Sequence, residues 1–361
     1  MDVERGPAAE TEPSSFERVA DLPLRIDDQS LAVNERETVA FTRKTTTVSL
    51  RGGGHVGRGE DVTYDADEHD ALAEAGLPSL AGEYTLASFS DHLDDVDLFP
   101  AGEPDREVFR DYRRWGVESA ALDLALRQAG TDLGAAVGRE YDPVRFVVSP
   151  RLGDPPTTDR LDSILDLHDD LEFKLDAEPE WDDDLIEALV AVDRVRVVDM
   201  KGQYEGTEVD QPADPELYGR VIAGLPDALI EDPKVTDETR PLLDPVAERV
   251  TWDAPLHDLR DVAAFPWAPQ WLNCKPSRFG TIESLFDFLD YCDANGVSLY
   301  GGGQFELDVG RGQIQLLASV FYPEGPNDVA PGGYNDPEVD AGLPGSPLSP
   351  PAEPVGFRWS E

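Results

Sequence analysis

Lysine is scarce in this chain: only five of its 30 basic residues are lysines, and the others are arginines. We expect a chain with so strong a preference for arginine to keep its lysines for chemistry that an always-charged guanidinium does not perform. Three of the five, Lys174, Lys201 and Lys275, stand at the ends of short apolar segments that also carry acids. These segments are therefore the candidates for a functional site.

Basic residues of both kinds are few, because 75 acids face 30 bases and the formal net charge is −45. The acids are spread along the whole length and do not form one acidic tail. We interpret them as a solvated acidic surface suited to high salt, where counter-ions screen the self-repulsion of the chain. A nucleic-acid partner is not expected, because no basic face is present to neutralise phosphates.

Cysteines and long apolar runs are also nearly absent. Cys274 and Cys292 form no spaced motif, which argues against a disulfide framework or a zinc site and fits a reducing compartment. No run of about 18 apolar residues occurs, and the acidic first residues lack the basic and apolar regions of a signal peptide. We therefore expect a cytoplasmic protein with no membrane partner.

Residues 16–140 predict an α+β capping domain. Alternating segments at 16–26 and 37–50 and a glycine-rich turn at 51–59 before a strand at 59–64 indicate antiparallel strands, and helical patterns follow at 67–75, 86–96 and 105–130. The flanking segments 1–15 and 336–361 are rich in proline, glycine, serine and acids, which is typical of extended or poorly ordered ends. The second of these is a tail that can pack back on the cap.

Residues 141–335 repeat the order strand, loop, helix. Strands are predicted at 144–150, 172–176, 194–199, 228–233, 249–255, 271–278 and 298–306, with a last short one near 327–330. Helices are predicted at 158–168, 182–191, 215–224, 237–243, 282–295 and 312–320. This rhythm predicts an α/β fold of the TIM-barrel type, whose functional residues lie at the carboxyl ends of the strands.

Three carboxylates, Asp199, Glu231 and Asp253, end three successive predicted strands. Carboxylate oxygens are the hard ligands that Mg²⁺ or Mn²⁺ prefers. Any one of these acids taken singly can equally be a helix cap or a surface charge. Their position on three consecutive strands favours a shared metal site.

Two lysines flank these carboxylates in strand order, since Lys174 lies one strand before them and Lys275 one strand after. Bases on both sides of a substrate carbon can take or return a proton on either face. A nearby divalent cation lowers the pKa of a lysine toward a useful range. The alternative is that both lysines form structural ion pairs, a role that arginine would serve equally well.

The segments resemble the enolase superfamily, in its mandelate racemase and muconate-lactonizing branch, over nearly the whole chain. VSLRGGGHVGRGEDVTY resembles the hairpin of the capping domain, and GVESAALDLALRQAG resembles the helix that follows it. IEDP, TWDAP, NCKPSRFGT and GGGQFE resemble successive strand-end motifs, of which NCKPSRFG is the most specific. The resemblance implies a modified (β/α)7β barrel behind an α+β cap.

By this resemblance Asp199, Glu231 and Asp253 are the Mg²⁺ ligands, Lys275 is an acid/base, and Glu306 is an acid of the seventh strand near the substrate. The implied chemistry is removal of the proton next to a substrate carboxylate, with the resulting enediolate stabilised through the metal. Whether a lyase, racemase or cycloisomerase outcome follows is left open.

Two positions depart from the pattern of the branch. Lys174-x-Asp176 stands where Lys-x-Lys is usual, and Asp199-x-Lys201 stands where Asp-x-Asn is usual. The second base is therefore Lys174, Asp176 or Lys201, and we rank Lys174 first. Tyr204 and His55 are further candidates for contact with the substrate, from the segment after Asp199 and from the cap turn.

We therefore expect an enolase-superfamily lyase or isomerase that acts on a small carboxylate and forms a homo-oligomer. The alternative is a paralogue without activity that binds a small acid or serves as a scaffold, because its second-strand base pair has changed. A sugar isomerase or aldolase on an ordinary barrel is disfavoured, because none of the five histidines lies at a predicted strand end. Retention of Lys275 and all three carboxylates favours the enzyme.

The acidic composition predicts that the fold depends on salt. Crowded carboxylates repel one another at low ionic strength, so removal of roughly molar salt should lower the melting temperature. Thermal unfolding followed by circular dichroism in low and in molar salt tests this. A melting temperature that does not change would reject the interpretation of a high-salt surface.

Overall fold

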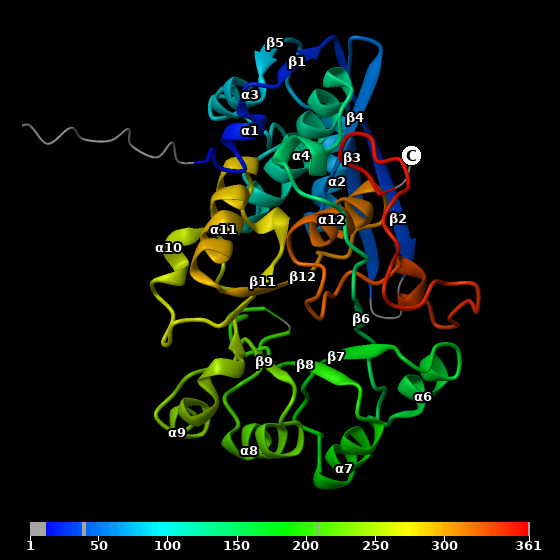
Figure 1. Ribbon diagram of the computed structural model, residues 1–361, viewed down its shortest axis with the longest axis vertical. Coiled ribbons are helices and arrows are strands. Elements are labelled where there is room, and N and C mark those ends of the chain that lie inside the picture. Colours follow the sequence, from blue (N-terminus) through cyan, green and yellow to red (C-terminus); the bar gives the residue numbers. More distant parts are fainter. Residues whose placement is uncertain (1–11, 38–40, 208, 360–361) are drawn as a thin grey trace, which may run out of the picture.

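The computed structural model describes residues 12–37, 41–207 and 209–359. It confirms the predicted cap and barrel, which lie one above the other in Figure 1, with the cap at the top. The two parts are packed together: Glu118 on helix α4 (Val108–Ala129) accepts a hydrogen bond from the N–H of Ile282, the first residue of barrel helix α11 (Ile282–Asn295).

The cap strands are antiparallel, as the alternating segments predict, and they form two sheets. Three strands pair in the order β2 (Asp28–Glu37), β3 (Thr42–Gly52) and β4 (His55–Asp61), and β1 (Pro23–Ile26) pairs with β5 (Gly82–Thr85). Helix α4 lies directly on β4, because glycine leaves room for its backbone: a Cβ at Gly57 would lie 2.2 Å from the carbonyl oxygen of Ala120. The remaining cap helices are α1 (Glu17–Ala20), α2 (Ala66–Ala75), α3 (Leu86–Leu93) and α5 (Leu133–Val137).

The barrel strands run parallel in the order in which they occur in the chain. They are β6 (Val147–Val148), β7 (Glu172–Asp176), β8 (Val195–Asp199), β9 (Leu229–Glu231), β10 (Val250–Thr251), β11 (Trp271–Cys274) and β12 (Ser298–Gly301). Backbone hydrogen bonds outside the strands close the ring. The N–H of Asn273 donates to the carbonyl of Trp252. In the same way, the N–H of Asp328 donates to the carbonyl of Gly301, and the N–H of Val147 donates to the carbonyl of Asn327. The segment at 327–328 thus takes the place of the eighth strand.

Helices cover the outside of this ring (Figure 1). They are α6 (Asp159–Leu165), α7 (Asp183–Val192), α8 (Pro215–Gly224), α9 (Arg240–Leu243), α10 (Leu259–Val262), α11 and α12 (Val309–Phe321), with 3-10 turns η1 (Asp244–Arg249), η2 (Pro276–Arg278) and η3 (Gly332–Asn335). Some of the abundant acids serve as N-caps, where a carboxylate accepts an otherwise unpaired backbone N–H. Such caps are Asp65, Asp132, Asp182, Asp214 and Asp258. None of the helices in the described ranges is long and apolar enough to cross a membrane.

A few elements differ from the sequence-based expectations. Part of the strand expected at 16–26 is helix α1, and β2, β5, α5 and α10 have no counterpart among the predictions. Apart from β2, which has ten residues, these elements have four or five residues each. Segments this short show too little periodicity to reveal their type, and tertiary contacts decide it.

The chain ends lie outside or only partly within the described residues. Of the N-terminal segment expected to be extended, residues 1–11 fall outside them, and Ser15 donates both its N–H and its hydroxyl to Asp290. Of the C-terminal tail, residues 360–361 fall outside. Its middle residues contact the barrel, where Leu348 pairs with Val144, and its end lies on the cap, where Phe357 is fully buried edge-to-face with Trp115 and Arg358 forms an ion pair with Asp123.

Two buried charged side chains of the cap hold the loop that follows β12. Glu60, on β4, accepts hydrogen bonds from the backbone N–H groups of Leu307, Asp308 and Gly310, at the start of α12. Arg43, on β3, donates to four carbonyl oxygens, those of Val62, Thr63, Gln304 and Phe305. The cap therefore fixes residues 304–310 of the barrel.

Glu60 should make stability depend on pH. Burial raises its pKa to about 7, and the nearby Glu306 adds to the effect. A carboxyl whose pKa is raised in the folded state contributes stability at low pH that is lost as the pH rises through the folded pKa. We expect the free energy of unfolding of the parent, relative to Glu60→Gln, to fall by about 2 kcal/mol between about pH 5.5 and 8.

Urea unfolding of both proteins at constant salt measures this difference. A matched control is Glu83→Gln, an exposed carboxyl on β5. Parallel curves of stability against pH for the parent and Glu60→Gln would contradict the prediction.

Candidate functional site

Three carboxylates meet where β8, β9 and β10 end. Asp199 is paired in register with Glu231, which is paired with Thr251, and Asp253 follows two residues after Thr251. All three side chains are fully buried. The parallel register therefore brings together the acids that the sequence places on successive strands.

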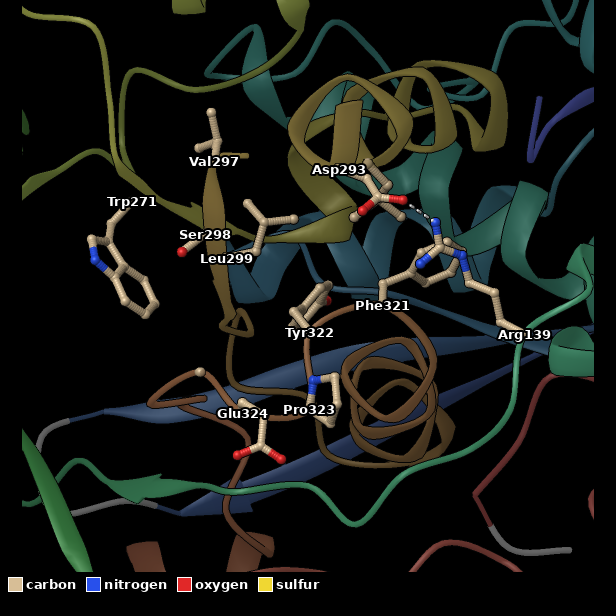
Figure 2. A pocket seen from close by; sticks show the side chains of 12 residues that line it. Arg139, Trp271, Asp293, Val297, Ser298, Leu299, Phe321, Tyr322, Pro323 and Glu324 are labelled. Atoms are coloured by element: carbon tan, nitrogen blue, oxygen red, sulfur yellow. Dashed lines mark hydrogen bonds and ion pairs between the residues drawn. The ribbon is translucent and has the colours of Figure 1, made fainter. Parts of the chain in front are cut away.

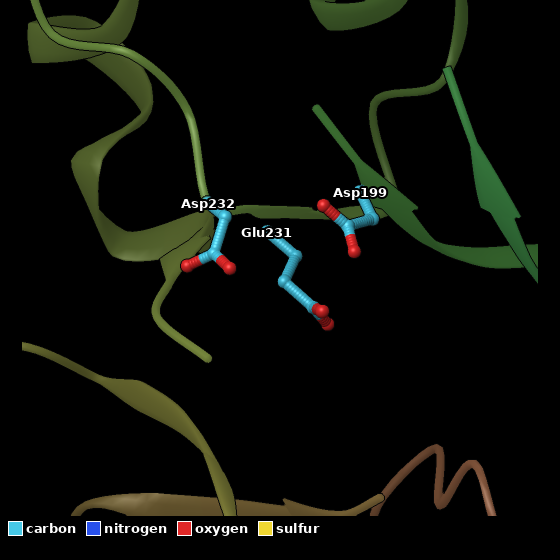
Figure 3. A group of neighbouring side chains, drawn as sticks. All are labelled: Asp199, Glu231 and Asp232. Atoms are coloured by element: carbon cyan, nitrogen blue, oxygen red, sulfur yellow. The ribbon is translucent and has the colours of Figure 1, made fainter. Parts of the chain in front are cut away.

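A fourth carboxylate, Asp232, belongs to the same group. Figure 3 shows it beside Glu231 and Asp199, and one oxygen from each of these three side chains lies within 4.8 Å of the others. Its two oxygens accept hydrogen bonds from the N–H groups of Asp253 and Ala254, each at 2.8 Å. Asp232 has a φ of 48°, a left-handed conformation that is unfavourable for residues other than glycine. Such a conformation is kept only where surrounding contacts hold it in place. It thereby positions the segment that carries Asp253.

Four cations are paired with this group. Lys174 Nζ lies 2.5 Å from Glu231 Oε1 and 4.0 Å from Asp199. On the other side, Asp253 Oδ2 receives Lys275 Nζ at 2.8 Å and Arg278 Nη2 at 3.2 Å. The fourth cation is Lys201, whose Nζ lies 2.5 Å from Asp199 Oδ2. Lys174 and Lys275 thus flank the carboxylates, as their strand order predicts.

The two residues that depart from the usual pattern contact each other. Lys201 Nζ lies 3.2 Å from Asp176 Oδ1, at the end of β7, and also 5.1 Å from the centre of the Tyr204 ring. Lys201 has a φ of 51°, and its N–H donates to Asp199 Oδ1. Asp176 and Lys201 are therefore one ion pair across the ends of β7 and β8.

Two phenols also reach the carboxylates. The Tyr300 hydroxyl, on β12, donates to Glu231 Oε2, and the Tyr204 hydroxyl donates to Asp253 Oδ2 at 2.9 Å. Burial raises the pKa of both tyrosines well above the usual value, and the neighbouring carboxylates act in the same direction. Both phenols therefore stay protonated and act as hydrogen-bond donors.

Burial and charge divide the acids into two kinds. Burial raises the pKa of Glu231 to about 8, although Lys174 opposes it, and burial together with Asp253 raises the pKa of Asp232 to about 7. Burial also acts to raise the pKa of Asp253, but the positive charges of Arg278 and Lys275 outweigh burial and hold this pKa below the usual range. An added cation would therefore stabilise the anionic forms of Glu231 and Asp232 most strongly.

The lysine beside Glu231 is strongly held in its charged form. Burial acts to lower the pKa of Lys174, but the carboxylates of Glu231 and Asp199 outweigh it and raise that pKa. The same balance raises the pKa of Lys201, through Asp176 and Asp199.

The donor set fits a hard divalent cation. Asp253 Oδ1 and the side-chain oxygen of Asn273 are buried, and neither accepts a hydrogen bond from any residue in the described ranges. A buried oxygen without a donor is costly, and a cation would satisfy it. These oxygens and those of Asp199, Glu231 and Asp232 are the ligand type that such cations prefer. The buried carboxylate group can therefore hold a metal ion.

Glu306 lies beside this group and not within it. Its Oε1 accepts the N–H of Gln304, and its Oε2 lies 3.3 Å from Arg311. The loop that carries Glu306 contacts Lys275 through a glycine, because a Cβ at Gly302 would lie only 2.9 Å from Lys275 Cε. The backbone of the loop therefore packs directly on the side chain of Lys275.

His55 is not brought to the carboxylates. It is exposed at the start of β4, while the cap contacts the barrel loop near the other end of that strand, at Glu60.

A pocket of about 290 Å³ lies away from the carboxylate group (Figure 2). Trp271 and Ser298, which begin β11 and β12, line it, so it opens at the amino end of these strands, away from Lys275.

Sequence reasoning missed Asp232, Arg278 and Tyr300. Asp232 follows Glu231 directly in IEDP, and Arg278 ends the 3-10 turn that begins after Lys275 in NCKPSRFGT, so both lie within strand-end motifs. Tyr300 gave no signal, because a tyrosine inside an apolar strand is usually a packing residue.

Comparison with known proteins gives one family and one fold. No curated protein matches the chain. Two family models do: "Domain of unknown function (DUF8230) C-terminal domain" over residues 140–336 and "Domain of unknown function (DUF8230) N-terminal domain" over residues 17–136.

Solved structures share the fold at low sequence identity. A dipeptide epimerase from Methylococcus capsulatus, complexed with Mg ion, has 19% identity and a TM-score of 0.63, with 83% of this chain and 88% of that chain covered. Muconate lactonizing enzyme from Pseudomonas putida has 19% identity and a TM-score of 0.61 over 84% and 88%. A member of the enolase superfamily from Listeria innocua has 17% identity and a TM-score of 0.60 over 85% and 86%.

The two domain models together span most of the described residues, whereas the solved structures, at these identities, establish the fold alone. The chain therefore belongs to the DUF8230 family and has the fold of the enolase superfamily.

Proposed function

We propose that this protein is a Mg²⁺-dependent acid/base enzyme that removes the proton next to the carboxylate of a small organic acid. The observation that carries the proposal is the arrangement of two lysines, Lys174 and Lys275, on either side of one buried group of carboxylates. Solved structures with this fold include a muconate lactonizing enzyme and an epimerase that holds Mg. The outcome is a lyase or isomerase reaction.

Asp199, Glu231 and Asp253 would hold the metal. Asp232, and not Asp253, has an oxygen within 4.8 Å of both Asp199 and Glu231, but both oxygens of Asp232 already accept backbone N–H groups, whereas Asp253 Oδ1 has no donor among the described residues. We therefore assign the third ligand to Asp253 and a positioning role to Asp232. When bound, Mg²⁺ would supply positive charge that stabilises the substrate carboxylate as the proton leaves, and would disfavour the ammonium form of the nearby lysines.

The protein side chains supply the proton transfer and the orientation. Lys275 takes the proton on one face, and it is held for this by Asp253 and by the packing of Gly302. Lys174 returns or takes a proton on the opposite face. The Tyr204 hydroxyl and Arg278, both on Asp253 Oδ2, fix the carboxylate that Lys275 contacts. Glu306 lines the same side through the loop after β12.

A paralogue that binds a small acid without turning it over is the second candidate. The observation in its favour is that each of the four cations already has a carboxylate partner within the group. Exchange of the α-proton with solvent deuterium, measured by NMR over a panel of small carboxylic acids with Mg²⁺, separates the two functions. Binding without exchange would favour the paralogue.

The metal assignment predicts that Asp199→Ala loses a Mg²⁺ site. Removing one of three carboxylate ligands should weaken binding at least about 100-fold, by analogy with the 10- to 100-fold cost of losing an outer-shell partner. Calorimetric titration at constant high salt measures it, because the charge of −45 also attracts cations nonspecifically. Asp184→Ala, an exposed acid on α7, is the matched control. Equal Mg²⁺ binding by parent and Asp199→Ala would refute the assignment.

The roles of the lysines predict a large loss of exchange. Lys275→Ala should slow α-proton exchange about 10²–10⁴-fold, because a positioned proton transfer is typically worth this much, and Mg²⁺ binding should survive. Lys174→Ala should do the same, and Lys201→Ala should cost much less. Lys44→Ala, on the cap surface, is the control.

The outcome that would contradict this assignment is an essential Lys201 with a dispensable Lys174. The second base would then lie on β8 and not on β7, although the metal site would stand.

A further inference from the structure

The carboxylate group is balanced by built-in cations. Its four acids, Asp199, Glu231, Asp232 and Asp253, are fully buried, and four basic side chains, Lys174, Lys201, Lys275 and Arg278, contact them. With all eight groups ionised, the formal charges cancel. A divalent cation that enters would leave an excess of two positive charges in a buried region, which is costly unless one resident cation moves away.

Lys201 is the resident cation that has a second acidic partner outside the group. Among the described residues, Lys174, Lys275 and Arg278 form ion pairs only with acids of the group. Lys201 alone is also paired with an acid outside it, Asp176, at 3.2 Å. Asp176 is 46% exposed, whereas Asp199 is fully buried, so this second partner lies toward solvent.

Lys201 also occupies an oxygen that the metal needs. Its Nζ lies 2.5 Å from Asp199 Oδ2, and the other oxygen of Asp199 accepts the N–H of Lys201 itself. An ammonium and a divalent cation on the same carboxylate repel each other strongly at low local dielectric. The two cations therefore compete for Asp199.

We propose that Lys201 is a resident counter-cation of Asp199 that gives way to the metal by moving onto Asp176, so that the Asp176–Lys201 pair sets the metal affinity of the site. This inference rests on the proposed metal site, and it deepens that proposal by giving a role to the two residues that depart from the usual strand-end pattern. Lys201 is a positioning residue in this role and acts through Asp199. The ring centre of Tyr204 lies 5.1 Å from Lys201 Nζ, so this ring also contacts the ammonium.

Two substitutions should change Mg²⁺ affinity in opposite directions. Lys201→Met removes the competing charge, so the dissociation constant for Mg²⁺ should fall by about tenfold or more. Asp176→Asn removes the acceptor that takes Lys201, so the dissociation constant should rise by about tenfold. Calorimetric titration of the full chain with Mg²⁺ at constant high salt measures both. Lys234→Met is the matched control, because Lys234 is paired with the exposed Glu205 and should leave the affinity unchanged.

The change in melting temperature on metal binding gives a second test of the role of Lys201. Without Mg²⁺, Lys201→Met should melt below the parent, because Asp199 loses its main partner, and excess Mg²⁺ should raise its melting temperature by more than it raises that of the parent. If Lys201→Met does not fold, the half-exposed Asp176→Asn still tests the proposal.

The outcomes separate this inference from the proposed function. If the parent binds Mg²⁺ and both variants bind it equally well, the counter-cation role is wrong and the metal site stands. If Lys201→Met binds Mg²⁺ as the parent does but loses α-proton exchange, Lys201 is the second base. If the parent does not bind Mg²⁺ at all, both the metal site and the inference built on it fail.

Discussion

Four buried carboxylates at the end of the barrel are the constraint around which the rest of the site is built. Charges removed from water must be compensated, and here β7, the segments just after β8 and β11, and the turn η2 each supply a cation to the carboxylates at the ends of β8, β9 and β10. Two tyrosine hydroxyls complete the shell. A single substitution among these groups would leave an uncompensated charge, so their identities are coupled.

The cap shapes the site from a distance. Arg43 and Glu60 satisfy backbone groups of the loop after β12, and that loop packs through Gly302 on Lys275. Both cap residues are fully buried, so the loop they hold is not a free lid. The position of one proposed acid/base thus depends on residues more than 200 positions away in the sequence.

The DUF8230 chain keeps the enolase-superfamily fold while it changes two polar positions at the strand ends. The change is paired: an acid stands on β7 where a lysine is usual, and a lysine follows β8 where an amide is usual. The structure joins the two as one ion pair, which carries no net charge, whereas a lysine and an amide at these positions would carry one positive charge. A fold alone does not fix a reaction, and this exchange changes the groups that contact Asp199.

The sequence by itself determined the architecture and the approach of Asp199, Glu231 and Asp253, because strand periodicity and parallel register place the carboxyl ends of successive strands on one rim. It also singled out Lys174 and Lys275 through the rarity of lysine. Only the tertiary structure decided that Asp232 holds the Asp253 segment, that Tyr300 reaches Glu231, that Lys201 bridges Asp199 and Asp176, and that His55 lies elsewhere. The reason is physical: position along a strand fixes where a backbone ends, whereas the partner of a buried side chain depends on how neighbouring strands, turns and the cap pack around it.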